Sequence, residues 1–236
     1  AAMLFPPEAA GAEAPVPGEL LGLIGQARLA AAKVRDRFSP DGWAALTDLG
    51  KSAGRLAGKV HSGNDAAQAM SVLLRKISGF SGLVHENMYH FAGWRFLSLG
   101  RAQERADGTL MLAADFTAPE APAGMLEVAI EVCDSVMTHQ RRYRFGPSRE
   151  TVLDLLLLDA RNPRAVLNHV AQMRHHIARL PQAGVEGRLS ALQQVLLTLD
   201  TELRVTDPAA LTPDKLAQLR SQLGRSFDLI STTLLG

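Results

Sequence analysis

The sequence predicts an all-α fold, a bundle of amphipathic helices without a β-sheet. From Glu19 almost to the end of the chain, apolar residues recur with the helical period. Helix starts are marked by proline next to serine, threonine or asparagine, and no segment shows the alternation typical of a strand. Alanine and leucine dominate, whereas β-branched residues are sparse and scattered. These observations favour a helical bundle.

The expected helices follow one another along the chain. The first begins near Glu19, and Ser39 as N-cap with Pro40 and Asp41 in the first turn predicts the start of the second. Asn162 is expected to cap a later helix, and a proline-containing turn is expected over 117–124. The remaining helices are expected over about 64–77, 79–114, 126–142, 148–158, 164–179, 184–203 and 213–233.

The domain organisation follows from composition. Residues 1–18 are rich in alanine, proline and glycine and are expected to be a linker, so that 19–236 form the helical domain. A faint internal repeat is also present, because LGLIGQAR (21–28) aligns with LNHVAQMR (167–174) at several identical or similar positions. The bundle is therefore expected to carry a degenerate internal duplication.

Charge and cysteine content restrict the function classes. The chain has 236 residues with 25 Lys+Arg and 24 Asp+Glu, a net charge of +1, which does not favour a nucleic-acid binder. Its one cysteine, Cys133, excludes an internal disulfide and favours a cytoplasmic setting. No apolar run approaches the ~20 residues that span a membrane, so membrane insertion is not expected.

One expected helix carries a carboxylate between two glycines. Gly100 and Gly108 lie one turn before and one turn after Glu104. One interpretation is a solvated helix face with local Arg–Glu pairs. The other is a pocket in which the glycines make room for a buried Glu104, paired with Arg101 of its own helix or with Arg141 or Arg144 of the next. Both interpretations stay open at this point.

Other polar clusters are less specific. Arg141, Arg142 and Arg144 surround Tyr143, where cations either complete a helix C-terminus or bind a phosphate or carboxylate. The histidines do not fit a metal site, because His85 and His90 are five residues apart and point about 140° away from each other on a helix. A metal is therefore not expected. The sequence also shows no glycine-rich nucleotide-binding loop, so no cofactor is expected.

The stretch GWRFLSLGRAQERAD (93–107) resembles the signature of the bacterial alpha-E family, G-W-x-F-L-x-L-G-R-x-x-E-R-A-D. Gln103 departs from the family pattern, since an apolar residue is usual there. The family usually begins with an earlier helix that has no counterpart before Leu20, so the chain is expected to be part of a longer protein or a shortened member. Four more blocks resemble family motifs: VRDRFSPDGW (34–43), FSGLVHENM (80–88), RRYR (141–144) and LLLLDARNPRAV (155–166).

The resemblance implies a partner. Alpha-E proteins are encoded beside, or fused behind, circularly permuted ATP-grasp proteins, which join an activated carboxylate to an amine. It therefore implies an accessory domain that acts with an ATP-grasp ligase, in cis or in trans, in peptide or amide-bond modification, and that contacts the ligase or a peptide or amino-acid substrate. The alternatives are an enzyme that uses Glu104 as acid or base, and a scaffold held by buried salt bridges.

The residues expected to form the site are drawn from the matched blocks. Glu104 is the candidate catalytic residue, and Gly100, Gly108 and Trp94 are expected to form the pocket. The residues expected to bind the partner or an anionic substrate are Arg35, Glu86, Arg101, Arg105, Asp107, Arg141, Arg142, Arg144 and Arg164.

Overall fold

The structure, a computed structural model, describes residues 18–57, 63–180 and 188–234. Within these ranges the chain forms ten α-helices and no β-strand, which confirms the all-α prediction. The chain divides into two compact units, 1–94 and 95–236. The predicted linker lies outside the described residues, except for Gly18, which already belongs to the first helix.

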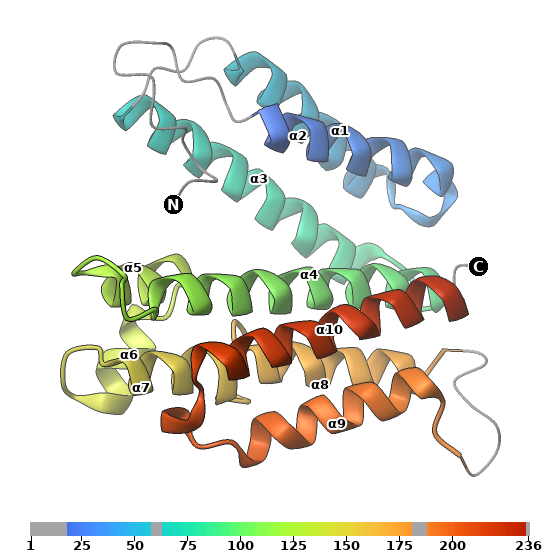
Figure 1. Cartoon of the computed structure of the whole chain (residues 1–236). Helices are drawn as coiled ribbons and strands as arrows, with labels where there is room; N and C mark the ends of the chain where they lie inside the picture. Colours follow the sequence, from blue (N-terminus) through green and yellow to red (C-terminus); the bar gives the residue numbers. More distant parts are fainter. Residues whose placement is uncertain (1–17, 58–62, 181–187, 235–236) are drawn as a thin grey trace. The chain divides into compact units, whose positions relative to one another are not determined.

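The first unit contains three helices: α1 (Gly18–Lys33), α2 (Pro40–Leu56) and α3 (Asn64–Asn87). Helix α2 packs against both of the others (Figure 1). The predicted start of α2 is confirmed, because the Ser39 hydroxyl accepts a hydrogen bond of 3.0 Å from the backbone N–H of Gly42. The buried core of this unit comprises Ile24, Ala31, Leu46, Leu49, Ala53, Ala66, Ala69 and Leu73.

The second unit holds most of α4 (Ala92–Phe116) and all later helices. These are α5 (Met125–Val132), α6 (Val136–Tyr143), α7 (Arg149–Leu153), α8 (Val166–Ile177), α9 (Ala191–Val205) and α10 (Pro213–Leu234). Helix α9 packs against both α8 and α10, and α10 runs beside α4 (Figure 1). None of the helices in the described ranges is long and apolar enough to cross a membrane.

The predicted helices differ from the structure at three places between 77 and 158. Helix α3 continues past 77 to Asn87, and α4 begins at Ala92 rather than at 79, because the backbone becomes extended at Met88. The helix expected over 126–142 is broken at Asp134, whose positive φ of 48° ends α5 and lets α6 start in a new direction. The α-helix expected over 148–158 ends at Leu153 and continues as a π-helical turn, Asp154–Leu158.

The predicted cap at Asn162 is also wrong. Helix α8 begins at Val166, and Asn162 instead folds the preceding turn, where its Oδ1 accepts a hydrogen bond from the backbone N–H of Arg164 at 3.0 Å. Its Nδ2 donates to the carbonyl oxygen of Leu155 at 2.9 Å. The start predicted for the next helix, 184, lies outside the described residues, and α9 begins at Ala191. The start of α10 at Pro213 is confirmed.

Candidate anion-binding site

Glu104 lies on the exposed side of α4, so its predicted burial is wrong. Among the described residues it forms no ion pair and no hydrogen bond, so pairing with Arg101, Arg141 or Arg144 is not seen. The core face of α4 lies elsewhere on the helix, at Leu99, Ala102, Ala106 and Leu110. The helical period places Glu104 well away from that face, and this placement explains the exposure.

The glycines beside Glu104 do not enclose a pocket. A Cβ atom placed on Gly100 or on Gly108 would meet nothing within 4 Å, and both residues are exposed. The acidic side chain that does find a partner on this helix is Asp107. Its carboxylate accepts hydrogen bonds of 2.8 and 3.2 Å from the Nε and Nη2 groups of Arg220 on α10. Asp107 therefore joins α4 to α10.

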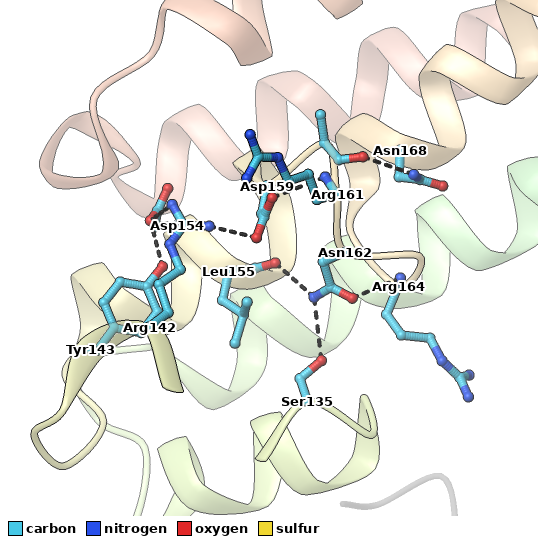
Figure 2. A network of polar contacts seen from close by, with 11 residues as sticks. Ser135, Arg142, Tyr143, Asp154, Leu155, Asp159, Arg161, Asn162, Arg164 and Asn168 are labelled. Atoms are coloured by element: carbon cyan, nitrogen blue, oxygen red, sulfur yellow. Dashed lines mark hydrogen bonds and ion pairs between the residues drawn. The ribbon is translucent and has the colours of Figure 1, made fainter. Parts of the chain in front are cut away.

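Arg142 is held by two carboxylates of its own unit (Figure 2). It donates from Nη2 to Asp154 at 2.7 Å and from Nη1 to Asp159 at 2.5 Å. Residues five apart on an α-helix diverge by about 140°. The π-helical turn overcomes this divergence, because the N–H of Asp159 bonds to the carbonyl oxygen of Asp154 five residues earlier. Arg142 thus joins the family-like blocks 141–144 and 155–166.

Tyr143 belongs to the same network. Its hydroxyl donates to Asp154 at 2.5 Å, and the pKa of Tyr143 is raised, first by burial and then by this hydrogen bond. Arg141 and Arg144 are exposed and have no hydrogen bond or ion pair within the described ranges. Of the three arginines predicted to bind an anion here, Arg142 therefore bonds to carboxylates of the fold, whereas Arg141 and Arg144 are exposed to solvent.

Three further predicted residues belong to the first unit. Arg35 donates from Nη1 to the carbonyl oxygen of Phe38 at 3.0 Å, and its guanidinium lies 4.9 Å from the ring centre of Trp43. Glu86 is exposed and has no partner in the described part of the chain. The ring of Trp94 stacks on His90 with centroids 3.8 Å apart. Arg35 and Trp94 therefore have local packing roles.

Three predicted arginines of the second unit do come together. Arg101 and Arg105 lie one turn apart on α4, and Arg164 lies in the turn before α8. Partial burial, followed by the charges of Arg101 and Arg164, lowers the pKa of Arg105. The charges of Arg101 and Arg164 therefore act on Arg105. Arg101 and Arg105 have no ion pair within the described ranges.

The arginine cluster carries an excess of positive charge. Its one carboxylate contact in the described residues is long, 3.7 Å from Arg164 to Asp134, and the Asp134 side chain is largely exposed. The backbone N–H of Arg164 donates to Asn162 within the turn, whereas the Arg164 side chain extends away from that turn (Figure 2). Arg164 also lies two residues before Val166, the first residue of α8, and the N-terminus of this helix adds partial positive charge.

A buried histidine faces these arginines. His169 is in the first turn of α8 and is only 2% exposed. Burial first, and then the charges of Arg105, Arg164 and Arg101, lower its pKa to about 4. Its Nδ1 atom is buried and has no hydrogen-bond partner in the described part of the chain. The neutral ring offers one donor and one acceptor nitrogen near the three arginines, and the tautomer decides which role Nδ1 takes.

This arrangement suits an anion. Guanidinium groups bind phosphate and carboxylate through bidentate hydrogen bonds. Buried polar atoms are also almost always hydrogen-bonded. His169 is absent from the site predicted by sequence, which treated the histidines only as metal ligands. The sequence did offer one signal, because His169 lies five residues after Arg164 of the NPR turn (162–164), near the start of a predicted helix. Among the described residues no group of three His, Cys, Asp or Glu could hold a metal ion.

A family model for a predicted alpha-helical domain with a conserved ER motif, Alpha-E, matches residues 8–234. The chain belongs to the Alpha-E family. Its sequence contains one Glu-Arg dipeptide, Glu104-Arg105. In this Alpha-E chain both residues are exposed, and they point to different sides of α4, with Arg105 in the arginine cluster. The two residues of the ER pair therefore lie on different surfaces of α4.

Relatives of this Alpha-E chain occur in mycobacteria. Uncharacterized proteins of Mycobacterium tuberculosis and Mycobacterium bovis are each 27% identical over 226 residues, which is 92% of this chain. The chain spans 25% of the length of these curated relatives. No solved structure matches the chain.

Proposed function

We propose that this Alpha-E chain is an accessory domain that binds an anionic group of its partner or substrate through Arg101, Arg105 and Arg164. The observation that carries the proposal is the cluster itself. Within the described residues it has three guanidinium groups, one long contact to a carboxylate, and nearby the buried Nδ1 of His169 without a hydrogen-bond partner. Arg101 and Arg105 are exposed and so accessible to a ligand, and a bound anion would relieve the repulsion between the like charges.

The proposed setting is amide-bond formation with a circularly permuted ATP-grasp ligase, in cis or in trans, in the cytoplasm. The support is the resemblance of the five sequence blocks to alpha-E motifs. ATP-grasp chemistry passes through an acyl phosphate made from a carboxylate, and both groups suit an arginine cluster. The proposal includes the internal duplication, with segments 21–28 and 167–174 on α1 and α8 as the related parts. Glu104 is exposed and forms no ion pair or hydrogen bond among the described residues, which favours a binding role over acid or base catalysis.

Calorimetric titration with inorganic phosphate and with acetate tests the anion site. Arg105→Met should weaken binding about tenfold, because it removes a charge-assisted contact. Arg141→Met is the matched control, since Arg141 is exposed, unpaired in the described ranges and outside the cluster. The site is refuted if neither anion binds the wild type, or if the two variants lose affinity equally.

Affinity capture from the native host tests the partner. A tagged full-length gene product should retain an ATP-grasp protein or should itself contain an ATP-grasp domain. A variant with Arg101, Arg105 and Arg164 changed to methionine should retain less of a separate ligase than the Arg141→Met control does. Recovery of no ligase, together with a gene product without such a domain, would overturn the partner proposal and leave the anion site to be judged by calorimetry.

A further inference from the structure

A second candidate site lies on another side of α4, where the helix runs beside α10. Here a groove of about 280 Å³ opens within the second unit. It is lined by Gln103, Glu104, Asp107, Leu223, Gly224, Phe227 and Asp228. At 100° per residue, Gln103 points about 160° away from Arg105 around the helix. The groove and the arginine cluster are thus on different flanks of α4.

Gln103 is the unusual residue of this groove. It is only 5% exposed, yet its side-chain amide forms no hydrogen bond within the described part of the chain. A carboxamide offers two donors and two acceptor positions, and those of Gln103 are available to water or to a ligand. Because Gln103 lines the groove, its remaining accessible surface faces the space that a ligand would fill. The Gln103 side chain is thus largely buried and has no partner among the described residues, while its amide stays open to the groove, and this observation is independent of the acidic residues.

The charges of the groove are negative. Glu104 and Asp228 are exposed, and neither carboxylate has an ion pair or hydrogen bond among the described residues. Asp107 is neutralised by Arg220. The groove therefore presents two uncompensated carboxylates beside the Gln103 amide.

The walls of the groove are apolar. Leu223 is buried, Phe227 leaves half of its surface exposed, and Gly224 between them adds no side chain. An aliphatic stem packs on such a wall, and a cation gains further from an aromatic face. The groove combines an apolar wall with acidic groups and a free amide oxygen, which together match a cationic side chain on an alkyl stem.

We propose that this groove binds the cationic side chain of a peptide, a lysine or an arginine. The alkyl stem lies along Phe227 and Leu223, the charged end is held by Glu104 and Asp228, and the carbonyl oxygen of Gln103 accepts a hydrogen bond from it. The proposal assigns Glu104 a binding role rather than a catalytic one. It goes beyond the proposed anion site and does not depend on it.

Nuclear magnetic resonance on the ¹⁵N-labelled chain tests this proposal. The probes are short blocked peptides with one central lysine, one central arginine or one acetylated lysine. The lysine or the arginine peptide should shift the side-chain amide signals of Gln103, and whichever binds more tightly names the preferred residue. The acetylated peptide should bind about tenfold more weakly, because it has lost its charge. Equal binding of the acetylated peptide, or no binding of either cationic peptide, would overturn the proposal.

Variants separate the contributions. Asp228→Asn and Gln103→Leu should each weaken peptide binding about tenfold, whereas Glu120→Gln, an exposed carboxylate outside the groove, should leave it unchanged. Wild-type affinity in Gln103→Leu and in Asp228→Asn would refute the site. Arg105→Met should not affect the peptide, which keeps this test apart from that of the anion site.

Discussion

The hydroxyl of Thr109 on α4 donates a hydrogen bond of 3.3 Å to the backbone carbonyl oxygen of Arg164 in the turn before α8. Thr109 is two turns beyond Arg101 and one turn beyond Arg105 on the same flank of the helix. The hydrogen bond therefore fixes the turn that carries Arg164 against the helix that carries the other two arginines. It ties the geometry of the cluster to the packing of the second unit.

Thr109→Val keeps the shape of this side chain and removes its donor. We expect a loss of about 1 kcal/mol in the free energy of unfolding, since Thr109 is nearly buried and the Arg164 carbonyl loses its partner. Phosphate affinity should fall as well, because Arg164 is held less firmly. Urea denaturation and calorimetry measure the two effects. Wild-type stability together with wild-type phosphate affinity would show that the hydrogen bond does not position the cluster.

Arg142→Ala removes the cation shared by Asp154 and Asp159. We expect the free energy of unfolding to fall by about 1–3 kcal/mol, because two carboxylates are left close to each other without their donor. Arg141→Ala, one residue away and exposed, is the control and should cost no more than a few tenths. Urea denaturation of both variants gives the comparison. Equal stabilities would show that the network around the π-helical turn contributes nothing measurable.

His169 predicts a loss of stability in mild acid. Its pKa is about 4 in the folded chain, below the value of about 6.5 expected for the unfolded chain. As the pH falls, the unfolded chain therefore takes up the proton first, so stability is complete above pH 6.5 and declines down to pH 4. The shift corresponds to about 3 kcal/mol.

The variant His169→Leu isolates this contribution from the other groups that titrate in acid. Between pH 7 and pH 4 the wild type should lose more free energy of unfolding than the variant does, as followed by urea denaturation at each pH. Parallel pH profiles for the two proteins would show that His169 has the same pKa in the folded and unfolded chain.

The elements that sequence predicted correctly are those with local signals. Ser39 and Pro40 mark the start of α2, and Pro213 marks the start of α10, because caps and prolines act within one turn. The breaks at Met88 and Asp134 have no such signal. Neither place has a proline, and the left-handed backbone of Asp134 is one that a non-glycine residue adopts only in a particular tertiary setting.

The site was predictable in part. Periodicity placed Arg101, Arg105 and Glu104 on one helix, but it could not show which flank of that helix other elements cover. Arg142 was expected to bind an external anion, yet the π-helical turn brings two carboxylates to it, and the sequence gives no sign of that turn. His169 was missed because the packing of α4 against the turn before α8 is a long-range contact.

The central claim is that Arg101, Arg105, Arg164 and His169 form one anion site. The most direct measurement is the pKa of His169 by nuclear magnetic resonance, in phosphate and in chloride of equal ionic strength. We predict that phosphate raises this pKa from about 4 by roughly one unit or more, since a bound anion offsets the arginine charges. His139, which is buried and bonded to Thr151, is the internal control, because burial is the cause of its lowered pKa. A His169 pKa that is the same in both solutions would contradict the claim.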